Sequence, residues 1–544
     1  TPEASWRRHS LSAIVQPADV PPDEGTLFLY RGWVRPLDDG LDLDAVQLAP
    51  MPLRDDQYQE RRANALAAGE GIFRQVRGLI AYREHSDERD EPVPPRLQSD
   101  LPPLSVPVHA REWAGRAWSP AIISGSVPLA RGLVFSPDAL RLRAPDGSEV
   151  PFQFDVLRRD RRDGSVRSLW LTFQAPLAAG ERASYTLESG ATTAPPPLLP
   201  VASREGDEVF LHTGDLLARA SGKEFSLLTE PRWGDSLAPG ERGGIRLELL
   251  DGTRLTSHGP PSQVVVERNG PLHAVVVVRG YLAPADGDVQ QRFRYEARLR
   301  AWRGIPGMRV DLAVTNLTPE PATPVRSLAL VLPTGRARRA EGAIGIAGGA
   351  PVTATLGRGE LLRVTQRRDP FRSGREDLLV EAPGADPSRV FGRAGGWATW
   401  QALDRPPILL AFSHMADRHP SALEVTPGEM AAYLIPPAGV QAFDFPFGLS
   451  AYGEFWVGSG EAPALVLDRL QCPPLVVPDP EHAARTGVFG AFSTAAETRR
   501  RFPLLEWILD REMALGIGDQ ERAGETGWLN DGDTGSFGCW LHGE

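Results

Sequence analysis

The stretch Phe293-Arg-Tyr-Glu-Ala-Arg-Leu-Arg300 decides the fold class of this chain. Apolar or small side chains alternate there with charged ones, and the run from Met308 to Thr315 repeats the alternation. A period of two with one charged face is typical of an antiparallel sheet that buries one side. We therefore predict strands in both runs and a mainly β protein.

The sequence around this stretch extends the sheet. Residues 263–267 and 272–279 are apolar runs joined by Arg268-Asn269-Gly270-Pro271, in which Asn-Gly supplies the positive φ of a tight hairpin turn. Further strands are expected at residues 328–332, 408–412, 432–435 and 449–457. Together they predict a large antiparallel β-sandwich over residues 195–472.

Residues 104–194 carry shorter apolar runs separated by turns such as Pro145-Asp146-Gly147. This spacing predicts a small β-barrel. Its strands are expected at residues 105–110, 121–127, 140–143, 150–154, 169–173 and 184–187. A proline cluster, Pro195 to Pro200, then marks the boundary with the sandwich.

The two ends of the chain differ from this β body. Residues 1–103 form a separate segment with a predicted strand at 26–30, a helix at about 55–77 and a charged, proline-rich linker. Residues 473–544 have helical spacing at 480–484 and 503–515, with Pro503 in a first turn and Gly516 as a cap. A short helical C-terminal segment is therefore expected.

Composition limits the class of function. The 544 residues favour three or four domains, and 41% hydrophobic with 24% charged residues is ordinary for a globular protein. No apolar run approaches the length of a membrane-spanning helix, so no span is expected. The net charge of −11 and the lack of a basic block argue against a nucleic-acid partner.

Rare residue types limit the chemistry further. Lys223 is the single lysine, so an amine that acts as a base would have to be this one. Cys472 and Cys539 lack zinc-site spacing, and the sequence leaves open whether they form one disulfide or two thiols. Because no export signal stands near Thr1, we expect that any such signal has already been removed.

The predicted barrel resembles a known family. It contains Ser124-Gly-Ser-Val-Pro-Leu-Ala-Arg-Gly132, Val150-Pro-Phe-Gln153 and Asp163-Gly-Ser-Val-Arg-Ser-Leu-Trp170. In this order the three motifs are similar to the RIFT barrel of the exo-rhamnogalacturonan lyase-like (YetA-like) family. The sandwich continues the resemblance in four motifs, Val265 to Pro271, Arg303 to Val310, Gly396 to Trp400 and His419 to Glu424.

This resemblance covers about residues 104–544 and implies a barrel, a central sandwich and an (α/α) toroid. The motif Trp528-Leu-Asn-Asp-Gly-Asp-Thr534, with Trp540, resembles the motif that opens the family's toroid, which runs for hundreds of residues. The sequence given stops at Glu544. The resemblance also implies β-elimination on an acidic, pectic-type polysaccharide, provided that a toroid is present.

The predicted site lies in this last polar cluster. Asp533 and His542 are the candidate catalytic residues, because eliminating a group from a uronic acid requires a base and a group that holds charge. The candidate substrate-binding residues are Trp528, Trp540 and Asn530. Asp531 and Asp533 could hold Ca²⁺, although the EF-hand spacing is absent. Calcium is the one cofactor that the residues suggest.

A second polar group is His414, Asp417 and His419, which could converge on a ligand or a metal ion or could be placed independently at a sheet edge. Asp163 and Arg167 are interpreted as structural residues of a turn and the strand after it. Asn316-Leu-Thr318 has the form of a glycosylation site, a common triplet. No Gly-x-Ser-x-Gly elbow or phosphate loop occurs, which disfavours serine hydrolases and nucleotide-driven enzymes.

The leading functional hypothesis is a secreted, periplasmic or surface-associated carbohydrate-active protein that cleaves or binds acidic polysaccharide or a cell-surface glycan. The competing hypothesis is a structural or adhesive subunit of a surface or virion assembly, with residues 1–103 docking a neighbour or a second copy. A third is a carbohydrate-binding module that uses exposed tryptophans, with Trp397, Trp400 and Trp456 as candidates and core positions as the alternative.

Overall fold

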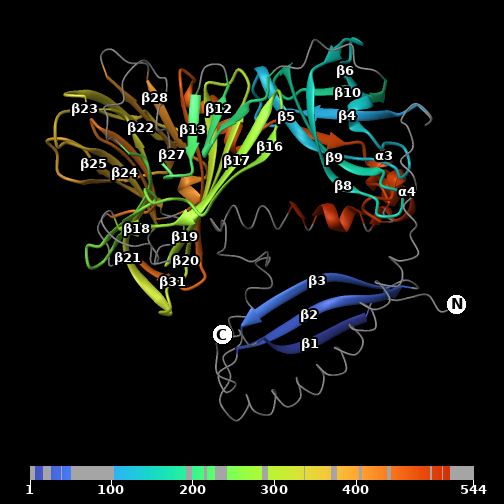
Figure 1. Ribbon diagram of the computed structural model, residues 1–544, viewed down its shortest axis with the longest axis horizontal. Coiled ribbons are helices and arrows are strands. Elements are labelled where there is room, and N and C mark those ends of the chain that lie inside the picture. Colours follow the sequence, from blue (N-terminus) through green and yellow to red (C-terminus); the bar gives the residue numbers. More distant parts are fainter. Residues whose placement is uncertain are drawn as a thin grey trace. The chain divides into compact units, whose positions relative to one another are not determined.

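The chain is described from a computed structural model in two units. The described residues are 7–15, 26–37, 40–50, 103–190, 199–213, 217–226, 242–284, 292–335, 337–368, 376–402, 407–418, 420–437, 443–490, 493–504, 506–511 and 513–514. One unit comprises residues 1–95 with 162–164, and the other comprises the rest of the chain. The mainly β prediction is confirmed (Figure 1).

The first unit contains an antiparallel sheet of three strands, in the order β1 (Arg7–Val15), β2 (Thr26–Leu37) and β3 (Gly40–Pro50). The strand predicted at 26–30 forms the start of β2. The helix predicted at 55–77 lies outside the described residues.

The second unit begins with a nearly closed barrel of eight strands, in the order β7-β6-β10-β4-β33-β5-β9-β8. Alternate side chains of its strands point inward, so Val106, Val108 and Ala110 of β4 join one buried apolar core. The predicted barrel strands are all present. Their bounds are β4 Ser105–Arg111, β5 Trp118–Pro128, β6 Leu140–Arg143, β7 Glu149–Val150, β8 Phe152–Arg159, β9 Val166–Leu177 and β10 Arg182–Ser189.

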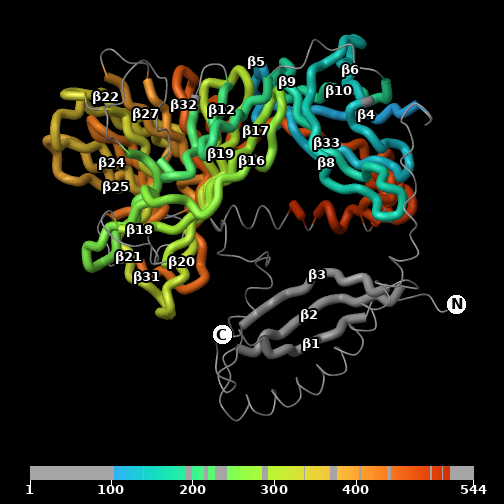
Figure 2. The backbone as a smooth tube through the Cα atoms, in the orientation of Figure 1, coloured from blue at the N-terminus to red at the C-terminus, as the bar shows by residue number. Residues whose placement is uncertain are grey.

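One barrel strand comes from the far end of the chain. β33 (Leu475–Pro478) pairs antiparallel with β4 and parallel with β5, although more than 280 residues separate it from the end of β10. Figure 2 shows it among the early strands of the barrel. Within residues 473–544, where the sequence predicts a helical segment, β33 is an additional strand, because four residues of Leu, Val and Pro carry too short a pattern to detect.

Two large antiparallel sheets and a small one form the sandwich. The larger sheet has the order β18-β15-β14-β21-β30-β29-β24-β25-β26, with β31 beside β21, and the nine-stranded sheet has the order β16-β17-β19-β20-β32-β28-β27-β22-β23. Both sheets contribute to one extensive core, in which Tyr295 and Leu299 of β19 meet Leu330 and Ala432 of the other sheet. The small sheet is β11-β12-β13.

The sandwich strands have these bounds: β11 Ala202–Glu205, β12 Glu208–His212, β13 Leu217–Ser221, β14 Gly244–Leu249, β15 Arg254–Thr256, β16 Gln263–Asn269, β17 His273–Tyr281, β18 Ala283–Pro284, β19 Phe293–Trp302, β20 Gly307–Asn316, β21 Ala322–Pro333, β22 Ala340–Ile346, β23 Val352–Leu356, β24 Leu362–Arg368, β25 Glu376–Glu381, β26 Ser388–Phe391, β27 Ala394–Gln401, β28 Ile408–Phe412, β29 Ser421–Val425, β30 Glu429–Ile435, β31 Phe443–Pro446 and β32 Ser450–Ser459.

The β16–β17 hairpin is confirmed, but its turn differs from the prediction. Neither Asn269 nor Gly270 has a positive φ. The Asn269 side chain instead bonds the backbone of Ala202, accepting from its N–H at 2.9 Å and donating to its carbonyl at 2.8 Å. A Cβ at Gly270 would lie 2.3 Å from Cδ of Gln153, so the barrel's approach requires glycine here. Tertiary contacts, and not local turn geometry, therefore explain why asparagine and glycine occupy these two positions.

Helix α2 (Pro463–Gln471) joins the sandwich to β33 and packs at the junction with the barrel. Val466 and Leu470 of α2 meet Ile122 of the barrel and Trp456 of the sandwich in a separate apolar cluster. Arg469, also from α2, lies between the rings of Trp118 and Trp456. Apolar contacts and the buried guanidinium group of Arg469 therefore join the barrel to the sandwich at this junction.

Two more helices follow, α3 (Pro480–Thr486) and α4 (Ala495–Arg501), and residues 503–504, 506–511 and 513–514 are helical. The predicted helices at 480–484 and 503–515 are confirmed where they are described, whereas Gly516 lies outside the described residues. Asp479 caps α3 by accepting from His482 N at 2.7 Å. Within the described residues no helix is long and apolar enough to cross a bilayer.

Candidate functional site

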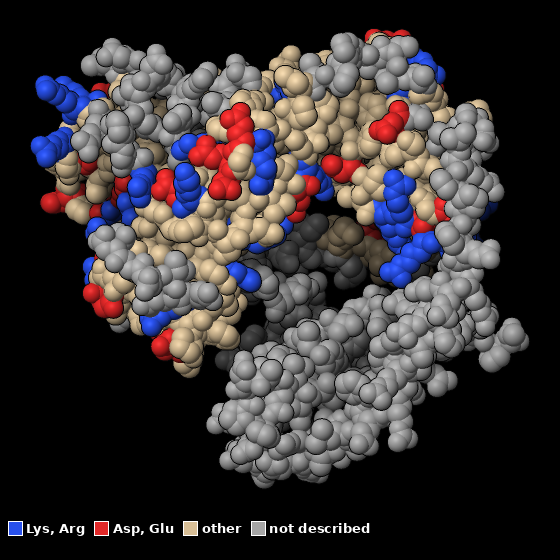
Figure 3. All heavy atoms as spheres, viewed as in Figure 1, with Lys and Arg blue, Asp and Glu red and all other residues tan. Residues whose placement is uncertain are grey.

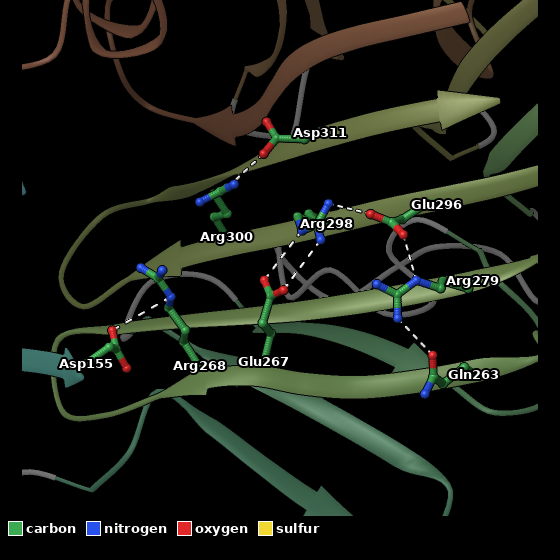
Figure 4. A network of polar contacts seen from close by, with 9 residues as sticks. All are labelled: Asp155, Gln263, Glu267, Arg268, Arg279, Glu296, Arg298, Arg300 and Asp311. Atoms are coloured by element: carbon green, nitrogen blue, oxygen red, sulfur yellow. Dashed lines mark hydrogen bonds and ion pairs between the residues drawn. The ribbon is translucent and has the colours of Figure 1, made fainter. Parts of the chain in front are cut away.

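The outward face of the nine-stranded sheet carries a continuous polar network. Along β19 the core side chains alternate with Arg294, Glu296, Arg298 and Arg300, which point away from the core. Figure 4 shows how Glu296, Arg298 and Arg300 meet polar neighbours on β16, β17 and β20. The sequence alternation that predicts the sheet therefore also builds this face.

The network links adjacent strands by ion pairs. Arg279 Nε donates to Glu296 Oε2 at 2.6 Å, and Arg279 Nη1 donates to Gln263 Oε1 at 2.8 Å. Arg298 bonds Glu296 and also reaches both oxygens of Glu267 at 3.4 Å (Figure 4). Although partial burial of Glu296 acts in the opposite direction, the two guanidinium groups lower the pKa of its carboxyl group.

The network continues to β20 and β32 through Asp311, a buried carboxylate. Arg300 Nε donates to its Oδ2 at 2.7 Å, and Arg309 Nε donates to its Oδ1 at 2.5 Å. Arg309 also lies 3.1 Å from Glu454 Oε1, which accepts a hydrogen bond from Tyr452 Oη at 2.8 Å. Burial, the charge of Asp311 and the bond to Glu454 all raise the pKa of Tyr452. This phenol therefore stays protonated at neutral pH.

Tyr452 offers an exposed ring at the edge of the network. Its side chain is 39% exposed, and the guanidinium carbon of Arg418 lies 5.2 Å from the ring centroid. Arg418 Nη1 also donates to the carbonyl of Tyr452 at 2.7 Å, which holds the arginine over the strand. An exposed aromatic ring beside a cation can stack on a sugar ring while the cation binds an acidic group.

The turn after β28 brings His414 to the same end of β32. Ser413 N donates to the carbonyl of Glu454 at 2.9 Å, and His414 then adopts a left-handed conformation with φ of 51° and ψ of 35°. A left-handed backbone is uncommon outside glycine, although histidine adopts it more readily than most residues. The half-exposed ring of His414 is thereby turned toward Asp417 of the short 3-10 turn η3 (Met415–Asp417).

His414 and Asp417 form a pair with Arg393. His414 Nδ1 lies 3.3 Å from Asp417 Oδ2, and the guanidinium of Arg393 bonds the other carboxylate oxygen. The bond from His414 and the charge of Arg393 lower the pKa of Asp417. The predicted partner His419 lies outside the described residues. Within the described chain, no group of three or more His, Cys, Asp or Glu side chains is placed to hold a metal ion.

We call this surface the arginine face, and it has an excess of positive charge. Six arginines stand against four carboxylates, an excess of two charges on a protein whose net charge is −11. Figure 3 shows acidic and basic side chains intermingled on the visible surface. The members of the arginine face are Arg279, Arg294, Arg298, Arg300, Arg309, Arg418, Glu267, Glu296, Asp311 and Glu454, with Tyr452 at its edge.

The site predicted near the C-terminus lies outside the described residues. This holds for the candidate catalytic residues Asp533 and His542, for Trp528, Trp540 and Asn530, and for the calcium ligand Asp531. Their roles stay predictions. Cys472 is half-buried and its predicted alternative partner, Cys539, also lies outside the described residues.

Two of the three tryptophans considered as exposed carbohydrate-binding residues are buried in the structure. Trp400 is fully buried in the main core, and Trp456 is 1% exposed at the barrel junction. Trp397 is half-buried, and its indole lies against Gly345, where a Cβ would meet Nε1 at 2.2 Å. Large apolar rings on two-sided strands pack inward, whereas the ring of Tyr452 is 39% exposed on this face.

The other residues singled out in the sequence are structural where they are described. Arg167 donates to the carbonyls of Leu129 and Thr486 at 3.1 and 2.8 Å, which ties β9 to α3. Asp163 lies in the turn before β9. Asn316 is fully buried and donates to the carbonyl of Phe445 at 2.7 Å, so the glycosylation triplet is not accessible. Lys223 is exposed, in the turn after β13.

No protein-family model and no curated protein matches the chain. Among solved structures it is distantly similar to an α-mannosidase from Enterococcus faecalis V583, at 10% identity over 70% of this chain and 47% of that chain, with a TM-score of 0.34. A glycosyl hydrolase family 38 protein from Enterococcus faecalis gives 10% identity over 71% and 49%, with a TM-score of 0.35.

A galactose mutarotase-like protein from Lactobacillus casei ATCC 334 gives 13% identity over 46% of this chain and 100% of that chain, with a TM-score of 0.27. This chain spans about half the length of the two Enterococcus faecalis proteins.

Proposed function

We propose that the chain is a carbohydrate-active protein whose arginine face binds acidic polysaccharide. The observation that carries the proposal is the excess of two positive charges on this face, beside the exposed ring of Tyr452. Guanidinium groups bind carboxylates in a planar, bidentate fashion that suits uronic acids. An exposed phenol ring adds a stacking surface for the sugar itself.

The electrostatics of the whole chain support this location. A net charge of −11 repels a polyanion from most of the surface, so an acidic glycan is attracted where the local charge reverses. Arg294 contributes most directly, because it is exposed and no ion pair holds it among the described residues. Acidic polysaccharides of the pectic type occur outside cells, which favours a secreted, periplasmic or surface-associated protein.

The finer proposal is cleavage by β-elimination, following the resemblance to exo-rhamnogalacturonan lyase-like proteins. Such a reaction needs a base for the proton beside the sugar carboxylate and a cation for the charge that develops. Beside the arginine face, His414 is suited to the first role, and Arg418 of that face is suited to the second, while Asp417 orients His414. Asp533 and His542 are the alternative pair that the sequence predicts.

Binding is tested by calorimetric titration of the full chain with oligogalacturonate. Exchanging Arg294 and Arg418 for glutamine should weaken binding at least about tenfold, because two of the charges that face the ligand are lost. Added salt should weaken binding by the wild type, since the contacts are partly exposed. Arg254→Gln is the matched control, because Arg254 is an exposed arginine of the other large sheet.

Equal affinity of the double variant and the wild type would overturn the proposed binding surface. Cleavage is followed separately, as absorbance of unsaturated uronate products. If the finer proposal holds, His414→Gln should lower the rate at least about a hundredfold and leave affinity for oligogalacturonate unchanged. A wild type that binds but releases no unsaturated product would contradict β-elimination and leave glycan binding in place.

A further inference from the structure

A second polar cluster lies on the outer face of the barrel, on strands that are direct neighbours (Figure 1). Ser184 of β10 is the register partner of His109 of β4, and both side chains point away from the barrel core. Ser184 Oγ lies 3.1 Å from His109 Nδ1. A serine hydroxyl is thus in hydrogen-bond contact with an imidazole that can accept its proton.

The other ring nitrogen of His109 faces a carboxylate. Nε2 lies 3.7 Å from Oδ2 of Asp479, which follows β33 directly. The Asp479 carboxyl group also accepts from His482 N, and this bond, opposed by slight burial, lowers its pKa so that it is charged at neutral pH. A charged carboxylate here favours the tautomer of His109 that carries its proton on Nε2, which leaves Nδ1 free to accept from Ser184.

Ser184, His109 and Asp479 differ in exposure. A reactive serine must be reached by its substrate, whereas its base must be held in place. The side chain of His109 is 14% exposed and therefore held in place by the strands around it. Ser184 is exposed, so a ligand can reach its hydroxyl. Asp479 is 28% exposed.

Two arginines stand beside the row on the same face of the ladder. Arg111 and Arg182 are register partners, each two residues along its strand from His109 and Ser184. The guanidinium carbon of Arg111 lies 3.7 Å from the ring centroid of Trp113, which holds it at the surface. Guanidinium donors at this position can stabilise negative charge that develops on a carbonyl oxygen near Ser184.

We propose that Ser184, His109 and Asp479 form a serine hydrolase triad that cleaves carboxylic esters on the outer face of the barrel. Ser184 is the nucleophile and His109 is the base. Asp479 is a positioning residue, because it acts through His109. Arg111 and Arg182 supply the positive charge for the oxyanion. This activity is separate from glycan binding at the arginine face.

The reaction balances without a cofactor. Ser184 Oγ bonds to the ester carbonyl carbon, and its proton passes to His109 Nδ1. The carbon–oxygen bond to the alcohol then breaks, and the leaving alcohol takes the proton from His109. A water attacks the acyl group, gives its proton to His109, and the serine departs with that proton as the carboxylic acid is released.

The sequence pattern could not reveal this row. Ser184 and His109 are 75 residues apart, and the carboxylate is brought in by the strand that closes the barrel from the far end of the chain. No Gly-x-Ser-x-Gly elbow is needed, since the serine lies on a strand. Triads are defined by geometry and roles, in any order along the chain.

The test uses the full chain with two probes, 4-nitrophenyl acetate for turnover and a fluorophosphonate for covalent labelling located by peptide mapping. The wild type should hydrolyse the ester and be labelled at Ser184. Ser184→Ala and His109→Gln should each lower the rate at least about a hundredfold and abolish labelling. Thr186→Val is the matched control, because Thr186 is the next outward residue of β10. It should change neither the rate of ester hydrolysis nor the labelling of Ser184.

Asp479→Asn keeps the acceptor for His482 N and so preserves the cap of α3. It should lower kcat at least about tenfold with little change in KM while the thermal unfolding midpoint stays that of the wild type, which separates a positioning role from loss of folded protein. Thermal unfolding of each variant confirms that the barrel is intact. An unlabelled wild type, or equal labelling of wild type and Ser184→Ala, would overturn the proposal.

Discussion

Two regions of this protein use arginine in opposite ways. At the barrel junction Arg469 is 8% exposed, lies between Trp118 and Trp456, and meets both oxygens of Glu461 at 2.8 and 2.7 Å. On the arginine face, arginines are half exposed and share carboxylates with one another. Burial, and not residue type, therefore determines whether an arginine stabilises the fold or remains available to a ligand.

The physical reason is the cost of removing charge from water. A buried guanidinium must be matched by its own carboxylate, and loss of either partner leaves an uncompensated charge. A half-exposed pair retains much of its hydration, so its net contribution to stability is small. The junction should therefore respond to mutation by unfolding, and the arginine face should respond mainly by losing affinity.

The largest effect is expected at the junction. Arg469→Ala removes the partner of Glu461 and the cation between two indoles, and should lower the free energy of unfolding by about 3–5 kcal/mol. The measurement is chemical denaturation followed by tryptophan fluorescence. Arg485→Ala, at a residue whose side chain is 68% exposed, is the control and should stay within about 0.5 kcal/mol. Similar losses of unfolding free energy in Arg469→Ala and Arg485→Ala would show that burial of an arginine does not determine its contribution to stability.

The next effect tests burial within the arginine face itself. Asp311 is 7% exposed and bonds Arg300 and Arg309, so Asp311→Asn should cost about 1.5–3 kcal/mol. Glu267, 42% exposed and 3.4 Å from Arg298, should change stability by less than about 1 kcal/mol when exchanged for glutamine. Denaturant midpoints of the two variants give the answer. A larger loss of stability for Glu267→Gln than for Asp311→Asn would show that burial does not determine how much a carboxylate contributes to stability.

The smallest effect at neutral pH concerns His273, at the start of β17. Its ring stacks on Trp302 at 5.1 Å, its nitrogens have no hydrogen-bond partner among the described residues, and burial lowers its pKa from 6.5 to about 3. The unfolded chain binds the proton first, so this group's contribution to stability is complete above about pH 6.5. It is lost as the pH falls toward 3, at about 1.4 kcal/mol per pH unit.

His273→Leu removes this titration and should flatten the acid side of the stability profile relative to the wild type. Unfolding free energies measured between pH 7 and pH 4 test it, with the exposed His212→Leu as the control that keeps the wild-type slope. Parallel profiles for His273→Leu and the wild type would mean that the ring is reached by water.

Most of the fold could be predicted, because the patterns are local. The alternation in residues 293–300 marks the strand and also its charged face, and the barrel strands follow from short apolar runs between turns. β33 and α2 were missed, since a strand of four residues and a helix after Ser459 carry too little periodicity. Asn269 and Gly270 mark the hairpin correctly, but tertiary contacts explain them: Asn269 bonds Ala202 of the sandwich, and Gly270 faces Gln153 of the barrel.

The candidate sites were harder to predict. His414 and His419 stand out in the sequence because they lie five residues apart with Asp417 between them, and the structure pairs His414 with Asp417. Tyr452 and Arg418 were missed because 34 residues separate the strand from the turn that covers it. Trp400 and Trp456 are core residues, in line with the alternative that most tryptophans of a sandwich are buried.

Local sequence patterns are enough to predict the antiparallel β class, the order of barrel before sandwich and the side of β19 that carries charge, because a period of two is a property of each strand alone. The packing of the folded chain sets which arginines are buried, how β33 joins the barrel and which serine meets which histidine. Those outcomes depend on contacts between residues tens or hundreds of positions apart, and no local pattern records them.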